Sequence, residues 1–343
     1  MDNSLTNTAG IGLSLAVWLA HEQYDSGASE HPGKDMISAT GLLKPTRQMI
    51  LANRVPPSDR QTDVSDLIAS RFGTAIHDSV DHAWHTGYKD ALSRLGHPQK
   101  MIDKIIINPS FDDLASMPGA IPVYLEQRFF RSIEVDGNEI VISGKFDQII
   151  NGELNDIKTT SAYTYTSGNK DDDYIIQGSI YRWINPTKVT SDLFRIQHIF
   201  TDWQRMQVKT TPGYPASRIV ESTYQLLSES QTETWMRAKI REILANQHLD
   251  EDQIVRCSDK ELWMSEPVFK YYADPAKAAE GGRSTKNFPN YPAAASFANK
   301  AGKGVVVTVQ AEPKACKYCP AFEICTQKDE YPSNLSPETE PTP

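Results

Sequence analysis

The chain of 343 residues has no long apolar segment and no excess of positive charge. Its one apolar run near the N-terminus, residues 11–20, is too short to span a bilayer and has no basic flank before it. We therefore expect neither a targeting segment nor a membrane helix. The net charge of −9 argues against a protein that coats nucleic acid through a basic surface. These properties predict a cytoplasmic protein with no membrane partner.

Cysteine is scarce, and its four copies are Cys257, Cys316, Cys319 and Cys325. A reducing cytoplasm disfavours disulfides between them. The last three lie within ten positions, and Cys257 brings the set to the four thiolates that a structural zinc ion or a [4Fe–4S] cluster needs. Such a ligand would close the C-terminal region, where the apolar pattern is poor. The residues alone leave zinc, an iron–sulfur cluster and reduced structural cysteines open.

The spacing of apolar residues predicts an α+β fold with a mixed sheet. Helical spacing predicts helices over residues 11–22, 65–95, 99–107, 173–185 and 221–246. Runs of β-forming residues predict strands over residues 121–133, 139–150, 154–160, 193–201 and 305–309. The turn signal Asn151-Gly152 joins the second and third strands as a hairpin, so the first three strands are expected to form a meander.

Composition and periodicity along the chain predict four segments. They are an N-terminal helical segment over residues 1–60, a core over 61–255, a cysteine-bearing region over 256–330 and a disordered tail over 331–343. Residues 273–303 are rich in Ala, Gly and Asn, which predicts an irregular insertion. No internal repeat is visible.

Two carboxylates and a lysine form the main chemical constellation. Asp147 lies in the second strand, and Asp156 and Lys158 lie in the third. Side chains alternate along a strand, so Asp156 and Lys158 share a face while Ile157 points the other way. The hairpin can bring Asp147 beside Asp156. Carboxylates hold Mg²⁺ through oxygen, and a nearby ammonium stabilises charge on a phosphate, so this set fits hydrolysis of a phosphodiester.

Other interpretations of these residues are weaker. An isolated Asp-x-Lys in a strand is most often a solvated edge. His77, His82 and His85 are spaced by five and three, which does not match the i, i+4 pair of a helical zinc site. Asp147 and Asp156 could suggest a glycosidase pair, but Lys158 on the same face fits a phosphate or metal site better.

The ordered set of motifs resembles the PD-(D/E)XK nucleases, and within them the RecB-like branch. Asp147 followed by Asp156-Ile157-Lys158 matches the D…(D/E)-x-K signature. Gly73-x-x-x-His77 precedes it and Gln177-x-x-x-Tyr181 follows it, as in that branch. A cluster of cysteines near the C-terminus is also common there. Any one motif is weak, but together they run in the family's order over residues 73–325.

This resemblance implies a restriction-endonuclease-like fold and Mg²⁺- or Mn²⁺-dependent hydrolysis of DNA. It makes His77 a metal ligand together with Asp147 and Asp156. Lys158 would be catalytic, with Gln177 and Tyr181 contacting the DNA backbone or supporting the lysine. Two further assignments follow: Glu126 as an additional acidic group, and a [4Fe–4S] cluster on the four cysteines.

The resemblance favours an exonuclease of recombination, repair or replication, similar in size to phage-type and CRISPR-associated members. A phage-encoded chain would work in the host cytoplasm. No Gly-x-x-x-x-Gly-Lys-[Ser/Thr] motif occurs, so a helicase or recombination partner would be a separate chain. Endonucleolytic action, an RNA substrate and a catalytically silent DNA-binding or assembly protein remain alternatives.

Candidate contacts to DNA are Arg128, Arg131, Lys145 and the segment 163–170. Within that segment Tyr163 and Tyr165 could stack on the bases of a single strand. The more ordinary interpretation is that these side chains cover the surface.

Overall fold

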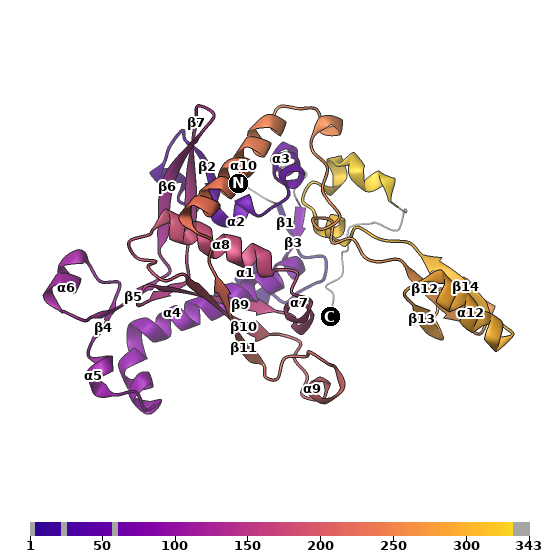
Figure 1. Ribbon diagram of the computed structural model, residues 1–343, viewed down its shortest axis with the longest axis horizontal. Coiled ribbons are helices and arrows are strands. Elements are labelled where there is room, and N and C mark those ends of the chain that lie inside the picture. Colours follow the sequence, from indigo (N-terminus) through magenta and orange to yellow (C-terminus); the bar gives the residue numbers. More distant parts are fainter. Residues whose placement is uncertain (1–3, 22–25, 57–60, 332–343) are drawn as a thin grey trace. The chain divides into compact units, whose positions relative to one another are not determined.

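The computed structural model describes residues 4–21, 26–56 and 61–331 and divides the chain into two units (Figure 1). The sheet unit comprises Ser4–Lys44 and Gln61–Glu242. The cysteine unit comprises Met1–Asn3, Pro45–Arg60 and Ile243–Pro343. This division differs from the segments predicted above, because residues 45–60 group with the C-terminal region and not with the N-terminal one.

The sheet unit mixes helices and strands, as the α+β class requires. Its strands are β1 (Ser4–Thr6), β2 (Asp35–Ser38), β3 (Gln61–Asp63), β4 (Ile105–Ile107), β5 (Ile121–Leu125), β6 (Arg128–Val135), β7 (Asn138–Lys145), β8 (Gln148–Ile150), β9 (Glu153–Thr160), β10 (Leu193–Phe200) and β11 (Ile219–Gln225). Its helices are α1 (Leu13–Ala20), α2 (Ala39–Leu42), α4 (Ile68–Arg94), α5 (Gln99–Ile102), α6 (Phe111–Ser116), α7 (Ala162–Ser167), α8 (Asp171–Ile184), α9 (Gln207–Thr210) and most of α10 (Glu229–Asn246).

A six-stranded sheet in the order β11-β10-β9-β8-β5-β4 forms the centre of this unit. β9 and β10 run parallel, and β8 pairs with β9 as an antiparallel hairpin. A Cβ added at Gly178 of α8 would meet the ring of Phe194, whereas one added at Gly73 of α4 would meet Thr159. Phe194 and Thr159 lie on opposite faces by strand alternation, so α8 and α4 cover the two sides of the sheet.

The predicted meander of three strands is wrong. The run expected over 121–133 breaks after Leu125, and the run over 139–150 breaks after Lys145. β5 and β8 belong to the six-stranded sheet, while β6 and β7 pair with β2 in a separate three-stranded sheet. Both segments of the chain therefore pass from one sheet to the other at the same corner, as strands do when two sheets meet at an angle.

Several predicted elements also shift in bounds. Residues 219–225 form strand β11 and not the start of a long helix, because their alternating exposure places them at the edge of the sheet beside β10. The helix begins at Glu229, after Ser228 and Gln231 exchange hydrogen bonds that cap it. The helix expected over 99–107 ends at Ile102, and β4 follows. The first helix ends at Ala20, and residue 22 lies outside the described residues.

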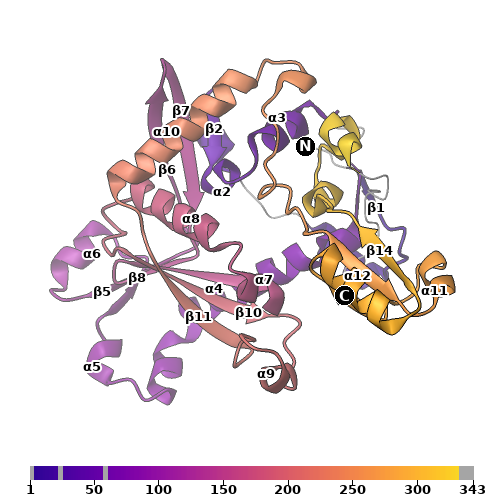
Figure 2. The ribbon, with the colours of Figure 1, turned by 45° about the vertical axis from the view of Figure 1, so that its right-hand side comes forward.

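The cysteine unit contains a small sheet where an irregular insertion was predicted. Its elements are α3 (Thr46–Arg54), β12 (Val268–Tyr272), α11 (Pro275–Ala279), β13 (Lys286–Phe288), α12 (Tyr291–Ala301) and β14 (Val305–Val309). The strands pair in the order β13-β12-β14, which confirms the strand over 305–309, and α12 packs on them (Figure 2). Phe297 of α12 anchors this packing, because its ring lies 5.1 Å from Tyr271 and 5.3 Å from Phe288. The predicted tail falls almost wholly outside the described residues.

Helix α3 joins the C-terminal region through its apolar face. Ile50, Leu51 and Val55 form one buried cluster with Ile254 and Ala321. Burial of such side chains stabilises by about 1.5–3 kcal/mol each, which explains why residues 45–60 group with this unit. In the part of the chain that the structure describes, no helix has both the length and the apolar character needed to cross a bilayer.

We expect Gly178→Ala to destabilise the sheet unit by about 1–3 kcal/mol and to lower its Tm by about 2–10 °C. The added Cβ would lie 2.5 Å from the Phe194 ring and 2.8 Å from Leu226. Thermal unfolding followed by circular dichroism measures the effect. Gly87→Ala on α4 is the matched control, since no described atom lies within 4 Å of its added Cβ, and it should be neutral or slightly stabilising. Equal melting of the two variants would contradict this packing.

Candidate functional site

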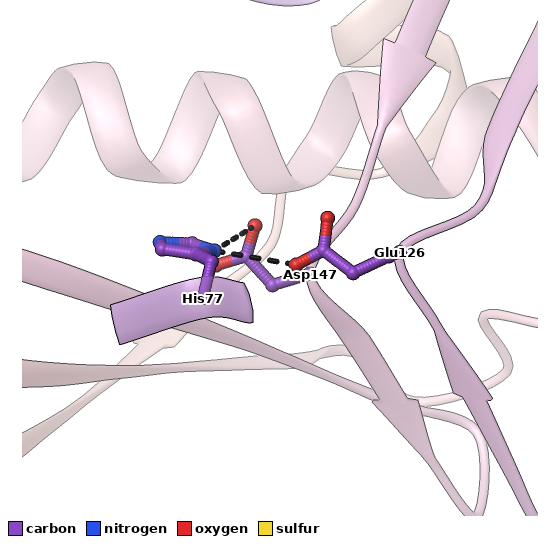
Figure 3. A group of neighbouring side chains, drawn as sticks. All are labelled: His77, Glu126 and Asp147. Carbon is purple, nitrogen blue, oxygen red and sulfur yellow. Dashed lines mark hydrogen bonds and ion pairs between the residues drawn. The ribbon is translucent and has the colours of Figure 1, made fainter. Parts of the chain in front are cut away.

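Three side chains converge near the corner where the two sheets meet. His77, Glu126 and Asp147 each offer a ligand atom, and these atoms all lie within 4.8 Å of one another (Figure 3). His77 Nδ1 lies 3.3 Å from Glu126 Oε1 and 3.4 Å from Asp147 Oδ1. All three side chains are half-buried. One imidazole nitrogen and two carboxylates form a donor set suited to a divalent cation.

The corner itself positions the two carboxylates. Glu126 follows β5 and Asp147 precedes β8, so each lies where the backbone passes between the two sheets. Glu126 N donates to Asp147 O at 2.8 Å, and Phe146 N donates to Gln127 O at 3.2 Å, which holds the two chains together at this point. Glu126 has φ +50°, a conformation uncommon for a residue other than glycine. Such local strain often accompanies a functional site.

Helix α4 and strand β9 complete the arrangement. Asp147 Oδ2 accepts a hydrogen bond from Ile157 N at 2.9 Å, and His77 Nε2 lies 3.1 Å from Ile157 O. Lys158 Nζ lies 2.8 Å from Asp156 Oδ2. That contact meets the distance of an ion pair but not the angle of a well-aligned hydrogen bond. The structure therefore brings Asp147 beside His77, and Asp156 beside Lys158.

Asp156 takes a different place from the one predicted for it. Its side chain is buried beside Lys158, and it is not part of the group of three that converges on His77. Glu126 fills that position. Lys145, a candidate DNA contact, instead pairs with Glu126 at 2.6 Å. The position of Glu126 follows from the break between β5 and β6, for which the sequence of 121–133 gives no local signal.

The crowding of acids shifts the pKa values at this corner. Burial and the charge of Asp156 raise the pKa of Asp147 to about 7, although His77, Lys158 and the Ile157 amide oppose the shift. Burial lowers the pKa of His77, but the bond to Glu126 and the charges of Asp147, Glu126 and Asp156 outweigh it and raise this pKa to about 9. Near neutral pH the imidazole therefore holds a proton where a cation would bind.

Lys158 remains an ammonium in this setting. Burial lowers the pKa of Lys158, but the charges of Asp156 and Asp147 raise it more, so the net shift is upward. Burial raises the pKa of the Tyr181 phenol, and the charges of Asp156 and Lys158 act on it in opposite directions. Lys158 can therefore supply positive charge, and both Lys158 and Tyr181 can donate hydrogen bonds. Neither group takes up a further proton near neutral pH.

Gln177 and Tyr181 lie one turn apart on α8, and Gln177 Nε2 donates to the Tyr181 hydroxyl at 2.9 Å. Both side chains are buried, with 5% and 6% of their surface exposed. A Cβ added at Gly144 of β7 would lie 2.9 Å from the Tyr181 ring, so the helix packs tightly here. This burial fits support of Lys158 better than contact with a DNA backbone.

Another candidate DNA contact is engaged within the fold. The guanidinium of Arg131 lies 4.2 Å from the centre of the Trp183 ring and donates to Trp183 O at 2.5 Å. It also pairs with Glu229 at 3.1 Å. Arg131 therefore fastens β6 to α8 and α10.

The four cysteines line one pocket of the cysteine unit. Burial raises the pKa of Cys257 to about 12 and that of Cys316 to about 11, and neighbouring thiols add to both shifts. The buried Arg47 of α3 donates from Nε to the sulfur of Cys325 at 3.3 Å. Among the described residues, the group at His77 alone has three ligand atoms within 4.8 Å of one another, so no three cysteine sulfurs lie that close.

Arg47 is the residue of this pocket that sequence reasoning missed. Its guanidinium also donates to the carbonyls of Glu251 and Ile254 at 3.0 Å. These partners lie more than 200 positions away, and no local pattern signals such a contact.

Known proteins show little similarity to this chain in sequence or in structure. No protein-family model and no curated protein matches the sequence. The crystal structure of SSO0001 is similar over 67% of this chain and 86% of that chain, with 15% sequence identity and a TM-score of 0.40.

Proposed function

We propose that the chain is a metal-dependent DNA nuclease of the RecB-like PD-(D/E)XK type. The observation that carries this proposal is the convergence of His77, Glu126 and Asp147 beside the Asp156–Lys158 pair. Groups with strongly shifted pKa values cluster at functional sites, and His77 and Asp147 are two such groups. A restriction-endonuclease-like core is part of the same proposal, supported by the β8–β9 hairpin that carries the acids and lysine between α4 and α8.

The residues present fit a divalent cation. His77, Glu126 and Asp147 would hold it, with the Ile157 carbonyl oxygen next to the imidazole. When bound, such an ion polarises a phosphate oxygen and lowers the pKa of a water molecule. Asp156 keeps the ammonium of Lys158 beside this group, and Gln177 and Tyr181 hold the helix that covers it.

Lys158 would act on the substrate through its charge. Because it keeps its proton, it can donate to a phosphate oxygen and stabilise the negative charge that develops there, but it cannot take a proton from water. This narrows the role predicted from sequence, where the lysine could also activate the water. Gln177 and Tyr181 would be positioning residues for Lys158.

Cleavage of labelled DNA with Mg²⁺ or Mn²⁺ tests the proposal. Linear single strands, linear duplexes, circular single strands and RNA of the same sequence should be compared. We expect linear DNA to be degraded and circular DNA to resist, which is the result for an exonuclease. Cleavage of the circle would indicate an endonuclease. Binding of DNA without cleavage under both metals would overturn the proposal and favour a silent DNA-binding protein.

We also propose that the four cysteines hold a [4Fe–4S] cluster. A tetrahedral zinc ion with bonds of about 2.3 Å holds its four sulfurs about 3.8 Å apart. The cysteine sulfurs are spread more widely than that, since no three lie within 4.8 Å of one another. A group of four irons is larger, and Cys-x-x-Cys spacing is common among its ligands. The Arg47–Cys325 hydrogen bond suits a thiolate that carries negative charge.

Replacing Cys319 with serine should remove the cluster and loosen the cysteine unit. We expect iron and acid-labile sulfide to fall from about four per chain to near zero, with loss of the brown colour. The apolar cluster around Ile50 and Ala321 packs against Cys319, so the Tm of this unit should also fall. Ala315→Ser is the matched control, because it adds a hydroxyl to the same pocket and removes no ligand. Stoichiometric zinc in place of iron would contradict the assignment.

A further inference from the structure

A second hollow of the sheet unit has no role in the site described above. It has a volume of about 530 Å³, within the range of small-molecule pockets. Helix α7, the first turn of α8 and strands β10 and β11 line it, all elements of one unit.

His198 of β10 lies at the floor of this pocket without a hydrogen-bond partner. It is 1% exposed, and neither of its ring nitrogens finds a donor or acceptor in the described parts of the chain. Burial lowers the pKa of His198, so the imidazole is neutral and presents one donor and one acceptor. A buried polar group left unsatisfied destabilises the fold, and a ligand that bonds to it would remove that cost.

Aromatic rings surround this histidine. The ring of Tyr165 on α7 lies 5.1 Å from it, and that of Tyr174 on α8 lies 6.0 Å from it. Tyr224 of β11 lies 5.8 Å from Tyr174, and its hydroxyl donates to Asp171 at 2.8 Å. Tyr165 and Tyr224 are half-buried and keep surface toward the pocket. Tyrosine rings on the wall of a pocket can stack against a flat aromatic ligand.

The charge of the lining excludes a phosphate as the ligand. Of the described residues that line the pocket, none is a lysine or arginine, and Asp171 carries a negative charge. A phosphate would be repelled, whereas a neutral ring with polar edges could bond to Asp171 and His198.

The position of the pocket relates it to the lysine of the proposed active site. His198 pairs directly with Lys158 across the parallel strands β10 and β9. Paired residues of neighbouring strands point to the same face and lie about 5 Å apart. A nucleotide whose phosphate reached Lys158 would thus have its base next to the pocket.

We propose that this pocket receives an unstacked nucleobase of a single DNA strand, next to the phosphate held at Lys158. The inference rests on the proposed nuclease function and adds to it a preference for single-stranded substrate. Tyr165 and Tyr224 stack on the base, and His198 and Asp171 bond to its edge. A base inside an intact duplex would first have to unstack and unpair, which costs free energy, so a single strand is favoured.

Oligonucleotide binding tests the pocket. Fluorescence anisotropy, with no divalent ion added, measures the affinity of a labelled single strand that carries one abasic site at successive positions. We expect one position at which loss of the base weakens binding to the wild type by about 5- to 100-fold. The Tyr165→Leu variant should bind the intact strand more weakly and should not distinguish it from the abasic strand at that position. His198→Phe keeps the ring and removes the polar edge, so its discrimination should fall in part.

Phe111→Leu is the matched control, because Phe111 is an aromatic residue of α6 in the same unit, is 85% exposed and does not line the pocket. It should keep the wild-type pattern. The inference would be overturned by no position-specific loss in the wild type, by no binding of the strand, or by the same change in Phe111→Leu as in Tyr165→Leu. Cleavage of DNA without the position-specific loss of affinity would refute the pocket alone. The loss of affinity without any cleavage of DNA would refute the nuclease function alone.

Discussion

Replacing Lys158 with methionine should lower the rate of DNA cleavage by about 10²–10³-fold, equivalent to about 2.7–4 kcal/mol of transition-state stabilisation. Methionine has similar length and volume but no charge. It removes the ammonium that lies 2.8 Å from Asp156 and that would face the phosphate. Single-turnover cleavage of a labelled single strand with Mn²⁺ measures the loss.

This variant also removes the countercharge of a buried carboxylate, so its folding has to be measured beside its activity. Breaking such a pair costs about 3–5 kcal/mol when the remaining charge stays buried. The pKa of the neighbouring Asp147 is raised to about 7, so this carboxyl can take up a proton and reduce the cost. Lys158→Arg keeps the charge and should keep the Tm, while its larger, planar head lowers the cleavage rate.

Lys209→Met on α9 is the matched control, because it removes an exposed lysine of the sheet unit and should leave both cleavage and Tm unchanged. A folded Lys158→Met variant that cleaves at the wild-type rate would remove the lysine from the mechanism. If Lys158→Met unfolds before it can be assayed, the folded Lys158→Arg variant carries the test. A wild-type rate in that variant would mean that the reaction needs the positive charge but not the shape of the lysine head group.

The parts of the site that sequence predicted well are those set by local periodicity. His77 lies on the long helix α4, and Gln177 and Tyr181 face one way on α8, because helical spacing fixes which residues share a face. The Asn151-Gly152 turn folds β9 back on β8, and Asn151 takes the positive φ that such a turn requires. Strand alternation then brings Asp156 and Lys158 to one face.

What sequence could not give was the exchange of strands between two sheets. The runs over 121–133 and 139–150 read as continuous strands. The polar pair Glu126-Gln127 and the isolated Gly144 lie near the two breaks, but such residues also occur inside strands and do not by themselves end one. The break depends on tertiary pairing, where Glu126 bonds to the backbone of Asp147. It places Glu126 beside His77 and Asp147, whereas Asp156 pairs with Lys158. The error at 219–225 has a related cause, because an edge strand beside β10 is stabilised by its neighbour and not by its own residues.

Binding of Mn²⁺ at the His77 group should release protons and should tighten by about tenfold per pH unit between pH 7 and 9. The pKa of His77 is raised to about 9, so across this window the imidazole is mostly protonated and must lose its proton before a cation can bind. Above about pH 9 the dependence should level off. Below pH 7 it should steepen, because Asp147, with a pKa raised to about 7, must then lose a proton as well.

Isothermal titration calorimetry in two buffers of different ionisation enthalpy measures both the affinity and the number of protons released. Near pH 8 we expect about one proton per ion, rising toward two near pH 6. His77→Asn keeps a neutral ligand and removes the titrating ring, so it should bind more weakly and lose most of the dependence between pH 7 and 9. His85→Asn, on the same helix and half-exposed beside Asp81, should behave as the wild type. Mn²⁺ binding that is independent of pH from 7 to 9 in the wild type would mean that the ion does not displace the His77 proton, and the three converging side chains would then be an ion-pair network and not a metal site.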